Sequence, residues 1–189
     1  MIQLNFTGAS GTGKTTMLNK LHELYPDLKI KTNVVRDLVK EKGIKINEMG
    51  NDEGQKVIFD AYDKFLIENK DEEYINDRCV IDPLAYTIVS AAGYQVDRSV
   101  LDYQWQRTKD IVDEGLLKVV FYFPIEFACA DDGVRSKDED YRKETDAAFR
   151  GIIDGLKDKF GEDKFRVVRV SGSVEERLEI IEKEIEKMR

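Results

Sequence analysis

Apolar and polar positions recur along this chain with two periods, one typical of strands and one of helices. Short apolar runs that predict buried strands occupy residues 2–7, 28–35, 73–77, 118–123 and 165–170. Between them, apolar residues recur every three or four positions, which predicts helices over residues 14–25, 36–43, 52–69, 84–92, 99–114, 149–160 and 174–188. Because helices join successive strands, we expect an α/β fold, with a doubly wound and mainly parallel five-stranded sheet between helices.

Length and composition indicate a single domain spanning residues 1–189. The chain has 189 residues, 41% of them hydrophobic, so it can bury a substantial core but is too short for two ordinary enzyme domains. No apolar run approaches the roughly 18 residues that span a bilayer, and the first residues lack a secretory pattern. We therefore expect a cytoplasmic protein that does not act at a membrane.

The net charge limits the kinds of partner that the protein is expected to bind. Lys and Arg number 30 against 38 Asp and Glu, a formal net charge of −8, which speaks against a long basic surface for duplex nucleic acid but leaves room for a local basic cleft. Cys79 and Cys129 lie far apart in a chain with one histidine, so we expect neither a disulfide framework nor a zinc site.

The strongest chemical motif is Gly8-Ala9-Ser10-Gly11-Thr12-Gly13-Lys14-Thr15, a full G-x-x-x-x-G-K-[ST] pattern between the first strand and the first helix. Such a loop curls its backbone N–H groups around phosphate oxygens at a helix N-terminus. Lys14 can reach the β- and γ-phosphates, and the Thr15 hydroxyl can bind Mg²⁺. The nucleotide-binding residues predicted here are Gly8, Ser10, Gly11, Thr12, Gly13, Lys14, Thr15 and Thr16.

A carboxylate is expected from a neighbouring strand, because the apolar run at 118–123 does not end in one. Asp77 closes the third predicted strand, where a doubly wound sheet presents its active site. It could hold Mg²⁺ or accept a proton from an attacking hydroxyl, and the adjacent Arg78 could bridge phosphoryl groups. A surface ion pair is the alternative for these two residues. Asp82 could be a helix N-cap or the catalytic carboxylate itself.

Residues 130–146, dense in charge, are expected to form a lid. Arg135, and after it Arg142, are the candidates to stabilise the transferring phosphoryl group, with a solvated charged surface as the alternative. Arg150, further along, is expected to be structural. The loop containing Gly172, after the last strand, could pack against a purine ring, while Ser173 and Glu176 also match a helix capping box.

Together these motifs resemble those of the P-loop nucleoside and nucleotide kinases, above all thymidylate-kinase-like enzymes and the ribosylnicotinamide-kinase-like AAA-domain family of phages and bacteria. The resemblance spans nearly the whole chain and implies a sheet order of 2-3-1-4-5. It also implies that Asp77 and Arg78 place Mg²⁺ and the acceptor, and that Arg36 contacts the acceptor, although Arg36 could instead pair with Asp37 or Glu41.

The base-reading pattern of thymidylate kinases is missing, so the acceptor stays open. Candidates to contact a base are Phe59, Tyr62, Tyr86, Gln104, Trp105 and Arg107, although an aromatic residue on a helix is more often part of the core. We expect a Mg²⁺-dependent ATP phosphotransferase acting on a nucleoside, a nucleoside monophosphate or a related small molecule, and a homodimer is compatible with the sequence. The alternatives are a kinase of a modified base, such as 5-hydroxymethyluracil, in phage DNA, and a nucleotide-dependent switch or ATPase module with a protein partner.

Overall fold

The computed structural model describes residues 1–32, 34–45, 50–128 and 138–189, which contain a parallel five-stranded sheet. Its order is β2-β3-β1-β4-β5, which confirms the doubly wound fold and the order that the kinase resemblance implies. The strands are β1 (Gln3–Thr7), β2 (Lys29–Lys31), β3 (Tyr74–Asn76), β4 (Val119–Tyr122) and β5 (Arg166–Arg169).

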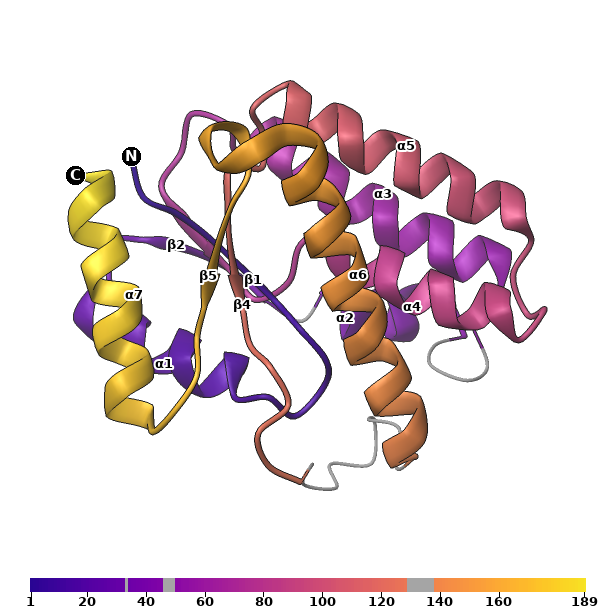
Figure 1. Cartoon of the computed structure of the whole chain (residues 1–189), viewed down its shortest axis with the longest axis horizontal. Helices are drawn as coiled ribbons and strands as arrows, with labels where there is room; N and C mark the ends of the chain where they lie inside the picture. Colours follow the sequence, from indigo (N-terminus) through magenta and orange to yellow (C-terminus); the bar gives the residue numbers. More distant parts are fainter. Residues whose placement is uncertain (33, 46–49, 129–137) are drawn as a thin grey trace.

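The strand register brings three loops to one edge of the sheet. Asn5 of β1 pairs with Asn76 of β3 on one side and with Val120 of β4 on the other. The carboxyl ends of these three strands therefore lie side by side, at the edge that points downward in Figure 1. Ligands of open α/β sheets bind at this edge.

Helices cover both faces of the sheet (Figure 1). On one face, α1 (Lys14–Leu24) and α7 (Val174–Met188) pack over an apolar cluster that includes Phe6, Phe121 and Ile181. The second cluster, on the other face, takes residues from α2 (Val34–Lys42), α3 (Asp52–Glu68), α4 (Ile81–Ala92), α5 (Arg98–Asp113) and α6 (Glu139–Lys164). Apolar burial on both sides makes the sheet a rigid base for the loops at its edge.

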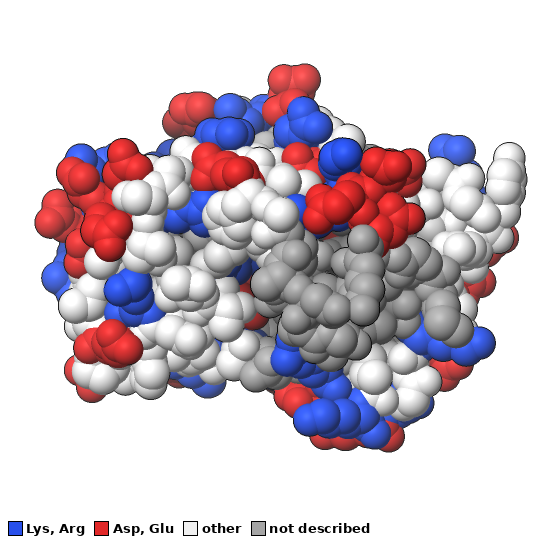
Figure 2. Space-filling view, turned by 90° about the horizontal axis from the view of Figure 1, so that it is seen from below, with Lys and Arg blue, Asp and Glu red and all other residues white. Residues whose placement is uncertain are grey.

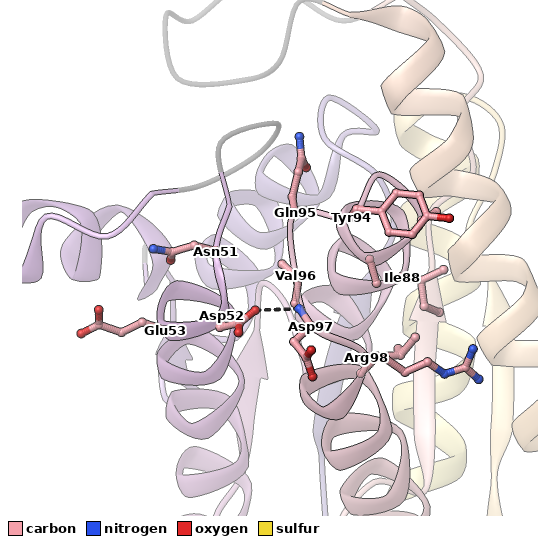
Figure 3. Close-up of a pocket in the computed structure, with 12 residues that line it drawn as sticks. Asn51, Asp52, Glu53, Ile88, Tyr94, Gln95, Val96, Asp97 and Arg98 are labelled. Atoms are coloured by element: carbon pink, nitrogen blue, oxygen red, sulfur yellow. Dashed lines mark hydrogen bonds between the residues drawn. The ribbon is translucent and has the colours of Figure 1, made fainter.

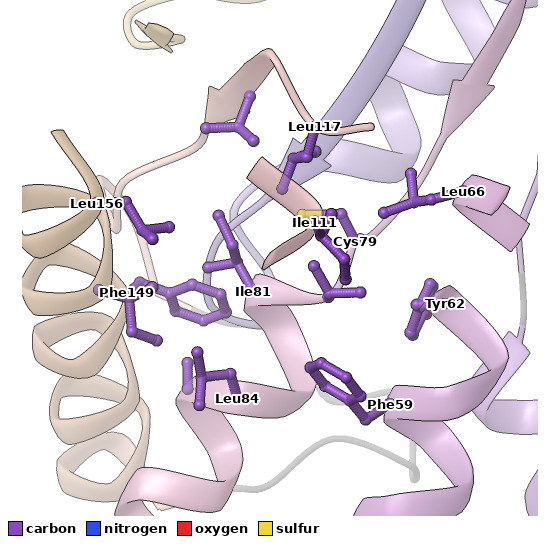
Figure 4. Packing of buried hydrophobic residues seen from close by; sticks show 14 of the residues in the cluster. Phe59, Tyr62, Leu66, Cys79, Ile81, Leu84, Ile111, Leu117, Phe149 and Leu156 are labelled. Carbon is purple, nitrogen blue, oxygen red and sulfur yellow. The ribbon is translucent and has the colours of Figure 1, made fainter. Parts of the chain in front are cut away.

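The larger of the two apolar clusters contains two of the aromatic residues that were candidates for contacting a base. Phe59 and Tyr62 of α3 point inward with Leu84 and Phe149 (Figure 4), and burial raises the pKa of the Tyr62 hydroxyl well above its ordinary value. Both residues are therefore part of the core.

Two element boundaries differ from expectation by more than three or four residues or in a way that bears on the site, while the others shift by a few residues. The second strand is shorter than predicted, because α2 already begins at Val34. Helix α6 begins at Glu139, so the second part of the segment expected as a lid is helical; Asp138 caps it by accepting hydrogen bonds from the backbone N–H groups of Asp140 and Tyr141. Residues 129–137, including Arg135, lie outside the described residues. In the part of the chain that is described, no helix is long and apolar enough to cross a membrane.

Candidate active site

The glycine-rich loop follows β1 directly and depends on backbone conformations that favour glycine. Gly8 has a φ of 135°, and a Cβ atom there would lie 2.4 Å from the carbonyl oxygen of Phe123. Gly13 has a φ of 92° and precedes the first residue of α1. Since glycine has no side chain to cap this helix, the N–H groups of its first turn are left for another acceptor, such as a phosphate.

Lys14 lies inside the curl of the loop. Its Nζ donates to the carbonyl oxygens of Gly8 and Ala9, each at 2.7 Å, and lies 3.2 Å from Thr12 Oγ1. The residue is 5% exposed, whereas the next residues, Thr15 and Thr16, are exposed. The loop thus combines a buried cation with accessible hydroxyl groups.

Two arginines distant in sequence donate hydrogen bonds to carbonyl oxygens of the loop that Lys14 does not contact. Arg142 of α6 donates from Nε to the carbonyl of Ser10 at 2.9 Å and from Nη2 to that of Phe127 at 3.0 Å. Arg177 of α7 donates from Nη1 to the carbonyl of Thr12 at 2.6 Å. Both guanidinium groups are buried. Arg142 was expected to stabilise the transferring phosphoryl group; among the described residues its guanidinium binds carbonyls of the loop, the carbonyl of Phe127 and Glu139. Sequence reasoning gave Arg177 no role.

Arg177 also reaches the loop that follows β5. Its Nε donates to the carbonyl of Gly172 at 2.9 Å, and its Nη2 pairs with Glu126, whose carboxylate accepts from the Gly172 N–H. The capping box predicted for Ser173 and Glu176 is confirmed at the start of α7. One guanidinium group therefore fixes the loops after β4 and β5 relative to the phosphate-binding loop.

Asp77 directly follows β3, and one of its carboxylate oxygens has no partner in the described part of the chain. Its backbone N–H donates to the carbonyl of Lys31 at 2.9 Å, which joins it to β2. Its Oδ1 is buried and has no hydrogen-bond partner among the described residues. A buried unpaired oxygen is costly unless a ligand or water satisfies it, so this atom marks a place where a ligand would be stabilised.

Asp82, in the first turn of α4, has both carboxylate oxygens occupied. Oδ1 accepts from Arg78 Nη1 at 2.7 Å, and Oδ2 accepts from Thr7 Oγ1 at 2.9 Å and from the Cys79 N–H at 3.1 Å. Burial raises the pKa of the Asp82 carboxyl, an effect that the charges of Arg78 and Lys14 oppose. The residue is 1% exposed, so this geometry favours a positioning role over direct contact with a substrate.

The other candidates for binding an acceptor separate into buried, paired and accessible residues. Gln104 is fully buried, and Arg107 is paired with carboxylates on α3 and α5. Tyr86 is half-buried beside Arg78, whose guanidinium carbon lies 6.0 Å from the ring centre. Arg36 is exposed in the first turn of α2, and Arg150 pairs with Asp146 at 3.3 Å. Arg78 and Tyr86 are thus the pair that the structure brings together next to Asp77.

A separate pocket of about 1000 Å³ lies between the start of α3, the end of α4 and the start of α5 (Figure 3). Asp52 accepts a 2.8 Å hydrogen bond from the Asp97 N–H across it. Ala91, one of its lining residues, is nine positions beyond Asp82 on α4, roughly 14 Å along the helix axis. The pocket therefore lies at the opposite end of α4 from the phosphate-binding loop.

Comparisons with known proteins agree with this architecture. The sequence matches the family described as AAA domain over residues 3–177, and a search of curated proteins finds no match. A deoxyadenosine kinase from M. mycoides with the products dCMP and dCDP bound is 16% identical with a TM-score of 0.62, covering 97% of this chain and 98% of that one.

Two further solved structures show the same fold. A thymidylate kinase from Candida albicans is 16% identical with a TM-score of 0.68, covering 98% of this chain and 91% of that one. A NadR protein in complex with NR is 14% identical with a TM-score of 0.61, covering 97% of this chain and 50% of that one. The chain therefore has the fold of P-loop nucleoside and nucleotide kinases.

Proposed function

Because the chain belongs to the AAA-domain family and has a P-loop kinase fold, we propose that it transfers the γ-phosphoryl group of ATP to a nucleoside, a nucleoside monophosphate or a related small acceptor. The observation that carries the proposal is the buried Oδ1 of Asp77, which has no hydrogen-bond partner within residues 1–32, 34–45, 50–128 and 138–189. It lies at the end of the strand next to β1, from which the phosphate-binding loop starts. A triphosphate and a carboxylate facing each other across this edge are the elements of phosphoryl transfer.

The donor side is formed by the loop from Gly8 to Thr15. Its glycine conformations and the start of α1 suit the β- and γ-phosphates, and Lys14 supplies the positive charge. The exposed Thr15 hydroxyl and the unpartnered Asp77 oxygen fit Mg²⁺, which prefers oxygen ligands. When bound, Mg²⁺ would neutralise charge on the β- and γ-phosphates.

On the acceptor side, Asp77 and Arg78 act on the attacking group. The acceptor oxygen forms a bond to the γ-phosphorus while the bond from that phosphorus to the β–γ bridging oxygen breaks, and ADP leaves. For a hydroxyl acceptor, the alternative role of Asp77, in place of holding Mg²⁺, is to take the proton. Arg78, held by Asp82, stabilises negative charge on the transferring group, and Arg135 contributes to the same task. Arg36 is the proposed acceptor contact from the β2 side.

Surface charge favours a small acceptor over DNA. Figure 2 shows the face with the carboxyl ends of the strands, on which basic and acidic side chains are interspersed. Duplex DNA is instead bound by continuous basic surfaces. The deoxyadenosine kinase that shares this fold carries dCMP and dCDP in one solved structure and dATP in another, all of which are small nucleotides.

The test measures ADP release with ATP, Mg²⁺ and a panel of nucleosides and nucleoside monophosphates, with DNA containing 5-hydroxymethyluracil as a further acceptor. We expect turnover with a member of the small-molecule panel. Turnover with the modified DNA alone would favour the DNA kinase, and slow hydrolysis that no acceptor accelerates would favour a switch or ATPase.

The variant Asp77→Asn tests the proposed site. It should lower turnover by about 100-fold or more, because it removes the charge proposed to organise Mg²⁺ or to take the acceptor proton, while ATP still binds through the glycine-rich loop and Lys14. Asp71→Asn, an exposed carboxylate outside the site, is the matched control and should retain activity. Wild-type turnover in Asp77→Asn would remove Asp77 from the mechanism.

A further inference from the structure

Phe127 is an exposed aromatic residue at the meeting point of the donor-side loops. It follows β4 and is 48% exposed. Its ring atom Cζ lies 3.6 Å from the position of a Cβ atom on Gly13, so the ring borders the phosphate-binding loop where α1 begins. No function proposed above uses this side chain.

The position of Phe127 is fixed at both its backbone and its ring. Its carbonyl accepts from Arg142 Nη2 at 3.0 Å. The guanidinium carbon of Arg177 lies over the ring, 5.3 Å from its centre. Stacking of a cation on a ring is favourable, and it leaves the rest of the ring open to solvent. An exposed aromatic held in this way is prepared to stack with another flat group.

Arg177 also indicates what this flat group is. The same guanidinium binds the carbonyl of Thr12 in the phosphate-binding loop and the carbonyl of Gly172 in the loop after β5. A nucleoside triphosphate held at its phosphates by the first loop extends its base beyond that loop. The ring of Phe127 lies next to the phosphate-binding loop, and the carbonyl of Gly172 is bound by the same guanidinium group of Arg177.

We propose that Phe127 is the stacking platform for the base of the donor nucleotide, a role that rests on the proposed function only in requiring a nucleoside triphosphate donor. A phenylalanine ring has no hydrogen-bonding group, so it selects a base by stacking area alone. This contact therefore favours purines over pyrimidines and does not distinguish ATP from GTP.

Calorimetric titration of the full chain with ATP, GTP, CTP and inorganic tripolyphosphate tests the proposal, since tripolyphosphate has no base. Phe127→Ala should bind ATP and GTP about 10-fold or more weakly, the effect of losing a base-stacking contact, and should bind tripolyphosphate within about twofold of wild type. It should also lose most of the preference for ATP over CTP.

Two variants and a control make the result decisive. Phe127→Tyr keeps the aromatic ring and should retain ATP affinity. Phe127→Leu keeps an apolar side chain without a ring and should bind ATP as weakly as Phe127→Ala. The leucine variant replaces the alanine variant in the test if Phe127→Ala does not fold. Ile67→Ala removes a side chain of matched exposure, 47%, on α3 and should leave all affinities unchanged.

If Phe127→Ala bound ATP with wild-type affinity, or if it bound ATP and tripolyphosphate with equally reduced affinity, the proposed stacking role of Phe127 would be wrong. Failure of the kinase proposal gives a different result, in which wild-type protein binds ATP but transfers phosphate to no acceptor. If wild-type protein bound neither ATP nor tripolyphosphate, both proposals would fall.

Discussion

Thr7 Oγ1 donates a 2.9 Å hydrogen bond to Asp82 Oδ2, although 75 positions separate the two residues in the chain. The other oxygen of the same carboxylate accepts from Arg78 at 2.7 Å. The last residue of β1 and the residue after Asp77 therefore share one buried anchor. Through this anchor, the glycine-rich loop after β1 and Arg78, the arginine proposed for the acceptor side, keep a fixed relative position.

Asp82→Asn should lower kcat by about 10-fold or more, because Arg78 loses a charge-assisted hydrogen bond and its orientation. ATP affinity should change little, since the hydrogen bonds of Lys14 to the loop are kept. Steady-state kinetics in wild-type and Arg78→Lys backgrounds provide the check. If Asp82 acts through Arg78, the second substitution adds little to the first; fully additive losses would contradict this role.

Arg177→Met should weaken the binding of both ATP and tripolyphosphate by about 10-fold, because the carbonyl of Thr12 loses its charged donor and the loop loses its shape. This pattern differs from that of Phe127→Ala, which spares tripolyphosphate. The control is Arg150→Met, whose side chain is mainly exposed and pairs with Asp146. Unchanged tripolyphosphate affinity in Arg177→Met would show that the phosphate-binding loop keeps its conformation without Arg177.

Gly8→Ala should destabilise the fold by at least about 2 kcal/mol, because the new Cβ would meet the backbone carbonyl of Phe123 at 2.4 Å and the φ of 135° is unfavourable for alanine. Gly151→Ala is the matched control. Its Cβ would meet nothing within 4 Å among the described residues, and it lies within α6. Urea unfolding should show a gain of about 0.5–1 kcal/mol for this control. Equal stabilities for the two variants would refute the steric argument.

Tyr74 should make stability depend on pH in the alkaline range. Burial raises the pKa of its hydroxyl from 10.0 to about 12. Since the folded pKa is the higher one, this stabilising contribution is complete below pH 10 and is lost as pH rises through 12. The free energy of unfolding of wild type relative to Tyr74→Phe should therefore fall by roughly 2–3 kcal/mol across that window. Parallel curves for the two proteins would contradict the shift.

The local pattern of the sequence was sufficient for most of the helices and strands, and it also predicts the donor loop. Periodicity predicted the strands and most helices to within a few residues, and the spacing from Gly8 to Thr15 predicted a phosphate-binding loop at the junction of β1 and α1. Ser173 and Glu176 predicted the start of α7. These signals are local, since a hydrogen-bonding cap or a glycine turn acts within a few residues. Periodicity does not determine strand order, which came from resemblance to a family.

By itself, then, the sequence determined most of the strands and helices and the presence of a carboxylate directly after the third strand, and it predicted where phosphate would bind. Only the tertiary structure decided which charged side chains turn inward. Asp82 could have been a helix cap, yet it binds Thr7 and Arg78; Arg177 lies in a helix rich in charge, yet it reaches Thr12, 165 positions away. Such contacts depend on how the sheet brings distant loops together, and a buried charge is stable only where partners from other elements meet it.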